Sequence, residues 1–158
     1  TGPITYGIAV RKLQINKSDE EKETDLQNIP DPVKRQARKE TMEKGIDAPI
    51  VMNSLRKAGE FLDQLETNIE DSGWIAGDKF SMADACTLPY IQRLDHLALS
   101  EAFSEEKRPK INKWYKKVKD LEFFDKAVTS QIPSPLVEMM NTFGEEVKDK
   151  ALTLMEEN

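Results

Sequence analysis

The sequence is poor in the residues that build disulfides, metal sites and membrane spans. It holds one cysteine, Cys86, and one histidine, His96. A lone cysteine cannot close an internal disulfide, which favours a reducing compartment such as the cytoplasm. One histidine and one cysteine do not make a usual zinc ligand set, so we expect no metal site. No apolar run approaches the roughly 20 residues that span a bilayer, and no signal segment opens the chain, so we expect no membrane insertion.

Positive charge is also in the minority. The chain has 158 residues with 23 Lys and Arg against 29 Asp and Glu, which gives a net charge of -6. Phosphate binding needs clustered cations, so this balance argues against nucleic acid as the main partner and against an anionic membrane surface. The length suits a single domain with a real core.

Alternating β-strand patterns are absent over useful lengths, whereas helical periodicity is plain. The clearest apolar stripe predicts one long helix: Val51, Leu55, Ala58, Leu62, Leu65 and Ile69. Further helices are expected from Ile8 to about Asn16, over 33–44, around 111–121 and over 134–156. Residues 17–28 are charged and are either a solvated helix or a mobile connection. The predicted fold class is an all-α bundle of about five to seven helices.

The stretch FSMADACTLPY, residues 80–90, combines an acid and a proline with an apolar helix. Ser81 and Asp84 have the spacing of a capping box, in which the carboxylate returns to the Ser81 N–H and the serine hydroxyl accepts from the backbone. Asp84 is therefore expected to be buried and hydrogen-bonded. Pro89 removes one backbone bond and should bend a helix that packs on nearly all sides. Phe80 is expected to pack on Ala85.

Residues 74–84, WIAGDKFSMAD, resemble a signature of the C-terminal, all-helical domain of the glutathione transferase superfamily. The segments 89–94, 108–114 and 123–127 are similar to the continuing family pattern, and the resemblance is dense from Asp47 to Val128. Residues 26–30, with Lys34 and Arg35, resemble the β-etherase-type branch. The family part is expected to span residues 1–132, with residues 133–158 as a C-terminal amphipathic helix extension.

The resemblance implies a division of labour between domains. Family members bind glutathione mainly through an N-terminal thioredoxin-like domain, and no βαβ pattern for it occurs here. The 158 residues would then be a piece of a longer enzyme and inactive alone, with no catalytic residue of their own. Their role would be to form a homodimer surface and one wall of the pocket for a hydrophobic small-molecule electrophile.

Candidate substrate-binding residues lie on the first helix, from which the family builds that wall: Tyr6, Val10 and Leu13. The Tyr6 phenol could stack on an aromatic substrate or simply pack inside the domain. Cys86 is expected to be buried and inert rather than a nucleophile. Trp74 and Trp114 are expected in the core, and His96 on the surface or near a helix cap.

A second function stays open at this stage. Helical domains of the same type also serve as non-catalytic protein–protein interaction modules, as in translation elongation factor subunits and synthetase adaptors. The final helix and the charged segment near Lys17 would then be the partner surfaces.

Overall fold

The computed structural model describes residues 1–157, and these residues form helices, turns and loops without any strand. The all-α fold class is therefore confirmed. The elements are α1 (Gly2–Thr5), η1 (Tyr6–Val10), α2 (Arg11–Gln14), α3 (Asp19–Gln27), α4 (Pro32–Lys44), η2 (Gly45–Asp47), α5 (Pro49–Asn68), α6 (Met82–His96), η3 (Ser100–Phe103), α7 (Pro109–Lys119), α8 (Phe124–Ala127), η4 (Thr129–Gln131), α9 (Ser134–Glu145) and α10 (Lys148–Glu156).

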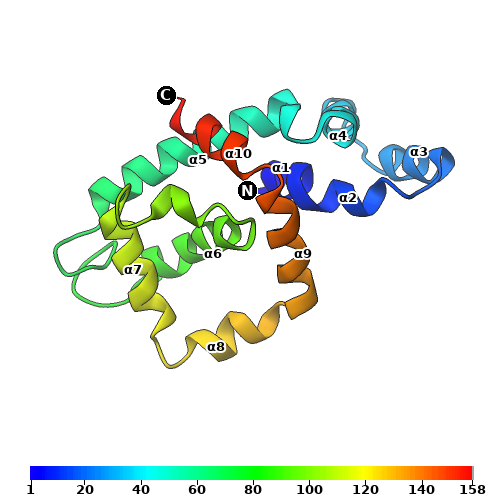
Figure 1. Ribbon diagram of the computed structural model, residues 1–158. Helices are drawn as coiled ribbons and strands as arrows, with labels where there is room; N and C mark the ends of the chain where they lie inside the picture. The colour runs from blue at the N-terminus through cyan, green and yellow to red at the C-terminus, as the bar shows by residue number, and fades with distance from the viewer. Residues whose placement is uncertain (158) are drawn as a thin grey trace.

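Helix α5 is the platform on which the bundle is assembled. In Figure 1 it runs across the molecule, with α10 beside it, α6 and α7 near one end, and α1, α2 and α4 near the other. Its expected apolar stripe is confirmed, because Val51, Leu55 and Leu62 are fully buried. Pro49 stands at the first helical position, where its missing N–H costs no hydrogen bond.

Two acidic side chains of α5 fix the start of α7. The carboxylate of Glu66 accepts from the backbone N–H groups of Lys110 and Ile111, each at 2.9 Å. These donors have no partner within α7, so a residue of another helix supplies the cap. Arg108, almost fully buried, donates to Asp63 Oδ1 through Nε at 3.0 Å and Nη2 at 2.7 Å.

The C-terminal part differs from the single helix expected over 134–156. The chain forms α9 and α10, which meet at a turn around Val147. The backbone of Leu97 approaches Gly144 so closely that a Cβ there would lie 2.0 Å from the Leu97 carbonyl oxygen. A Cβ on Gly59 of α5 would lie 1.9 Å from the Met155 carbonyl oxygen of α10. The two glycines let both helices return onto the core.

The structure of the first helix and of the charged segment after it differs in detail from what the apolar periodicity predicts. Residues 2–14 are helical throughout, but Tyr6–Val10 has the wider π-helical turn. Residues 19–27 form the solvated-helix alternative, α3, which buries only Leu26. Its start carries a capping box, with Ser18 N–H donating to Glu21 at 2.8 Å and Glu21 N–H donating to the Ser18 hydroxyl at 3.2 Å.

Helix α6 is buried on one side, not on nearly all sides as expected. Leu88, Ile91 and Leu94 are in the core. The opposite face exposes Met82, Cys86, Pro89 and Tyr90, so the expectation of a buried Cys86 is wrong. Positions 82, 86, 89 and 90 recur at helical spacing and therefore share one face of α6. The opposite face packs on the core through Leu88, Ile91 and Leu94.

Aromatic side chains pack together around the entry to α6. Phe80 packs edge-on against Trp74 and Phe123, with ring centroids 5.8 and 5.3 Å apart. Trp74 and Trp114 lie in the core as expected. Within residues 1–157, no helix has the length and hydrophobicity needed to cross a bilayer.

Gly59→Ala should destabilise the fold although alanine is the better helix former. The gain in helix propensity is about 1 kcal/mol. The added methyl group meets the backbone of Met155, which cannot swing aside, and overpacking of this kind typically costs 1–3 kcal/mol or somewhat more. We expect a net loss of stability in urea unfolding. Asn53→Ala, on the exposed face of the same helix, is the matched control and should be neutral or slightly stabilising. A Gly59→Ala protein as stable as the parent would contradict the close approach of α10.

Candidate functional site

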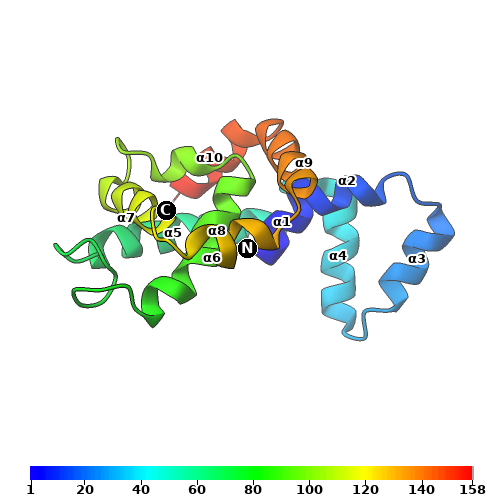
Figure 2. The same ribbon diagram turned by 90° about the horizontal axis from the view of Figure 1, so that it is seen from below.

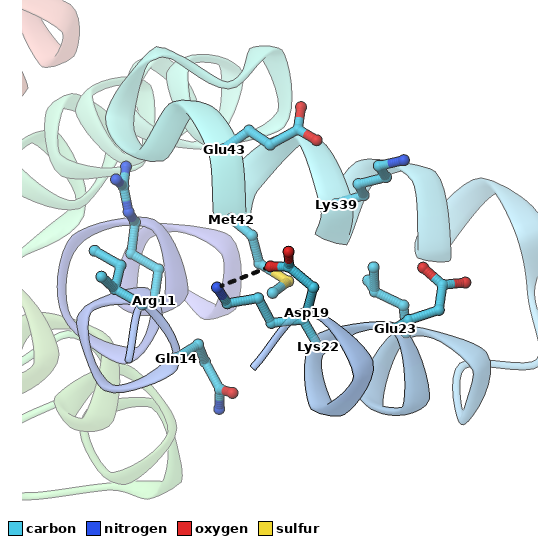
Figure 3. A pocket seen from close by; sticks show the side chains of 10 residues that line it. Arg11, Gln14, Asp19, Lys22, Glu23, Lys39, Met42 and Glu43 are labelled. Carbon is cyan, nitrogen blue, oxygen red and sulfur yellow. Dashed lines mark ion pairs between the residues drawn. The ribbon is translucent and has the colours of Figure 1, made fainter. Parts of the chain in front are cut away.

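A cavity of about 480 Å³ lies between α2, α3 and α4 (Figure 3). This volume is in the range of small-molecule sites. Its lining combines an apolar floor with a charged rim, made by Arg11, Gln14, Ile15, Asp19, Lys22, Glu23, Leu26, Lys39, Met42 and Glu43. The site is thus suited to an amphipathic or apolar molecule that lies between the first helix and the α3–α4 hairpin.

The hairpin that forms one side of this cavity is held by local hydrogen bonds. Asp31 caps α4 by accepting from the N–H groups of Val33 and Lys34, at 2.9 and 3.2 Å. The guanidinium of Arg35 donates twice to the Ile29 carbonyl, at 3.0 and 2.8 Å. These bonds define the turn at Pro30–Pro32, and Leu26 then anchors α3 against the rest.

The rim carries three basic and three acidic side chains, which leave it without a dominant sign. Figure 3 shows the Asp19–Lys22 pair, whose charged atoms are 3.6 Å apart. Two buried polar atoms, Arg11 Nε and Gln14 Oε1, have no hydrogen-bond partner among the described residues. The two side chains point in opposite directions in Figure 3, so they do not form a single anchoring point.

Gly45 provides the space that Arg11 occupies. Its φ is +59°, in the left-handed region that favours glycine. A Cβ at this position would lie 1.7 Å from an Arg11 guanidinium nitrogen. Gly45 therefore lets the cationic end of Arg11 lie against the turn between α4 and α5.

A smaller cavity of about 280 Å³ adjoins the first and shares Gln14, Leu26 and Met42 with it. Tyr6 lines this second cavity. The guanidinium carbon of Arg38 lies 3.6 Å from the centre of the Tyr6 ring, a cation–π contact. One face of the ring is thereby covered by the protein, while the half-buried side chain still lines the cavity.

The three substrate-binding candidates do not come together. Tyr6 lines the second cavity, whereas Val10 and Leu13 line neither, and Leu13 is 53% exposed to solvent. In a regular helix these positions share a stripe, but the π-turn at 6–10 changes the angle between them. The α3–α4 hairpin supplies the residues that sequence reasoning misses, and only its tertiary placement shows that Leu26, Arg38 and Met42 face the first helix.

The lining of both cavities contains no cysteine, histidine or serine. His96 belongs to a separate cavity of about 350 Å³ between α6, α7 and α9. Burial lowers the pKa of His96, and the nearby Arg93 lowers it further, which favours the neutral ring at pH 7. Tyr115 in the same cavity donates to Asp95 at 2.9 Å, and burial with the Asp95 charge raises the pKa of its phenol. The Tyr115 phenol therefore stays protonated and bonded to Asp95.

Asp84 is fully buried at the junction of three segments. Its Oδ1 accepts from the Ile75 N–H at 3.1 Å and from the Trp114 indole N–H at 2.8 Å. Its Oδ2 accepts from the Ser81 N–H at 2.9 Å and from the Ser81 hydroxyl at 2.7 Å. Burial raises the pKa of Asp84, but these hydrogen bonds outweigh it, and the pKa lies below its usual value. The carboxylate has all its acceptor positions engaged, so it serves the fold.

The comparisons with known proteins bear on the middle of the chain. The family model for the C-terminal domain of glutathione S-transferase matches residues 29–122, more than half of the 158. A protein named glutathione S-transferase TCHQD, from Arabidopsis thaliana, is 36% identical over 53 residues. That alignment covers 34% of this chain and 20% of the relative's length. No solved structure matches the chain.

Asp84→Ala should lower the free energy of unfolding by about 3 kcal/mol, because it leaves the buried Trp114 indole N–H and the half-buried N–H groups of Ile75 and Ser81 without an acceptor, and an unsatisfied buried donor costs about 1–3 kcal/mol. Chemical denaturation measures this. Asp78→Asn, at an exposed acid in the same loop, is the control and should be near neutral. A stability unchanged in Asp84→Ala would contradict the role assigned to the carboxylate.

The same residue should make stability fall in acid. A folded-state pKa below the unfolded one stabilises the protein above the unfolded value, and this contribution is lost as pH falls from the unfolded pKa through the folded one. We expect the stability of the parent to decline below about pH 4. Asp84→Asn should lack that part of the decline, so the difference between parent and variant should shrink with acidification. A difference that stays constant down to pH 2 would refute the linkage.

Proposed function

Because the chain belongs to the glutathione S-transferase family through its C-terminal domain, we propose that it is the substrate-side domain of a glutathione transferase-like enzyme. In the proposed reaction the thiolate of glutathione attacks an electrophilic carbon of a hydrophobic substrate. A carbon–sulfur bond forms, the bond to the leaving group breaks, and the leaving group departs with the electron pair. The thiol proton goes to solvent or to a base near the thiol.

The observation that carries this proposal is a cavity of small-molecule size whose apolar floor is made by Ile15, Leu26 and Met42. Its lining contains no cysteine, histidine or serine. The contribution proposed for this chain is therefore positioning, which holds the electrophile in reach of a thiolate bound elsewhere. A thioredoxin-like segment outside these 158 residues would bind glutathione.

A face for that thioredoxin-like domain is suggested by the exposed side of α6. Met82 and Tyr90 are 77% and 50% exposed. Tyr90 also lines an apolar groove of about 450 Å³ with Thr1, Ile4 and Phe61, and its ring lies 6.0 Å from that of Phe61. An exposed apolar stripe that continues into a groove is typical of an interface.

Finer features of the proposal rest on the family resemblance. We propose a homodimer in the cytoplasm, a β-etherase-type substrate preference, and a family domain over residues 1–132 followed by the extension 133–158. The extension packs tightly, since Ala151, Leu154 and Met155 are buried. Its helices therefore belong to the same core as α5, whatever the boundary of the family domain.

A non-catalytic interaction module is the second candidate function. Helix α3 favours it, because five of its nine residues are acidic and only one residue is buried. A helix that contributes so little to the core is free to contact a partner. The two functions differ in whether glutathione is bound at all.

Glutathione binding separates the two functions. The longer protein that contains this chain should be retained on immobilised glutathione and should conjugate a generic aryl halide. The 158-residue chain alone should do neither, because the thiol-binding groups are outside it. Retention and turnover can be measured by elution with free glutathione and by absorbance of the conjugate. Absence of both in the longer protein would remove the enzyme proposal and leave the interaction module.

Gln14→Phe tests the cavity itself in the longer protein. The side chain lies where the two cavities meet, so a ring there fills part of both. We expect the KM for the electrophile to rise about fivefold, equivalent to about 1 kcal/mol of lost binding, with the KM for glutathione unchanged. Gln64→Phe, at an exposed position of α5, adds the same ring away from the cavities and should leave both constants unchanged. Equal effects of the two variants would place the substrate elsewhere.

A further inference from the structure

Helix α7 is the most one-sided positive surface of this acidic chain. It contains five lysines and no acidic residue. Ile111, Trp114, Tyr115 and Val118 face the core, so the lysines make up nearly the whole outer arc. Although the net charge of the chain is -6, the outer face of α7 is therefore cationic.

The lysines of α7 are poorly neutralised by the chain itself. Lys110 and Lys117 donate to backbone carbonyls of Ile69 and Ser72, which carry no net charge. Lys116 pairs with Glu105 at 3.6 Å, but the two side chains are 63% and 82% exposed, so the pair contributes little. Lys113 has no hydrogen bond or ion pair with the residues that the structure describes.

Helix α3 has the opposite character. It contains five acidic residues and one lysine, and every acidic residue is exposed. Asp25 pairs with Lys17 at 2.7 Å and Asp19 with Lys22 at 3.6 Å. Glu20 and Glu23 form no ion pair among the described residues. The outer side of α3 thus keeps negative charge at Glu20 and Glu23 with which no cation of the described residues pairs.

The two helices cannot neutralise each other within one molecule. In Figures 1 and 2, α3 and α7 lie at opposite ends, and the two views agree. Their lengths are similar, 9 and 11 residues, or about 14 and 16 Å of helix. One helix laid along the other would align charges of opposite sign over most of its length.

We propose that α3 of one copy of this chain docks on α7 of a second copy. The contact is head-to-tail, with different surfaces from the two partners, so repetition builds chains or closed rings. It rests on charge complementarity and is therefore sensitive to ionic strength. It does not require the proposed enzymatic function, since sedimentation reports it without substrate, although Asp19, Lys22 and Glu23 of α3 also line the main cavity.

The experiment is a charge exchange followed by sedimentation velocity at about 20 mM and about 500 mM salt, where screening is weak and strong. The parent chain should sediment as larger species at low salt and as a smaller one at high salt. Lys113→Glu/Lys116→Glu should abolish the low-salt species, and so should Glu20→Lys/Glu23→Lys. A mixture of the two double variants should restore it, since each variant then offers the charge that the other lacks. Lys34→Glu/Lys57→Glu is the matched control for the lysine pair of α7, with the same change of net charge at other exposed sites, and should behave as the parent does.

Circular dichroism melting of each variant ensures that loss of association is not loss of folding. Association that survives high salt and both reversals would overturn the proposal, since it would lie on another surface. No association of the parent at low salt would also overturn it and would leave α7 to an acidic segment of a different protein. Failure of the mixed variants to associate would show that the two helices do not meet.

Discussion

A buried carboxylate with four hydrogen bonds holds together the half of the molecule that contains α6 and α7. Asp84 takes donors from the loop before α6, from the start of α6 itself, and from Trp114 on α7. A buried charge without partners would be strongly unfavourable, so the site is stable only when all three segments are in place. The hydrogen bonds are therefore cooperative, because the loss of one donor makes burial of the Asp84 carboxylate less favourable. A second contact joins α7 to the loop before α6, since the Lys117 ammonium lies 3.9 Å from the centre of the Trp74 ring.

The other half of the molecule is held by weaker means. The α3–α4 hairpin is fixed by the Asp31 cap, by the Arg35 bonds and by one buried side chain of α3, Leu26. Few buried apolar contacts imply low local stability and easy opening. The cavity of about 480 Å³ lies under this hairpin. The substrate site proposed above thus lies in the less firmly held half of the molecule, away from the end fixed by Asp84.

The features that could be predicted from the sequence are those that depend on interactions between residues close together in the chain. The Ser81–Asp84 spacing and the α5 stripe depend on contacts within one turn or along one helix, and such patterns are visible in a sequence. The exposure of Cys86 is not, because nothing local indicates which side of α6 the bundle leaves uncovered. The break between α9 and α10 follows from the fit of Gly144 against Leu97, a contact between distant parts of the chain. The candidate cavity was beyond prediction for the same reason, since α3 and α4 meet the first helix only in three dimensions.

The net charge describes the chain as a whole but does not show how the charges are distributed over its surface. A net charge of -6 argues against anionic partners for the chain as a whole. Electrostatic contacts, however, are decided within about a Debye length, roughly 10 Å at 0.1 M salt. Over that distance the outer arc of α7 is cationic, whereas α3 is anionic. Because exposed ion pairs within the chain do little to offset either surface, each keeps its field available to a partner. The two helices lie at opposite ends of the fold, so neither neutralises the electrostatic potential of the other. Helices of opposite charge placed side by side would have cancelled both potentials.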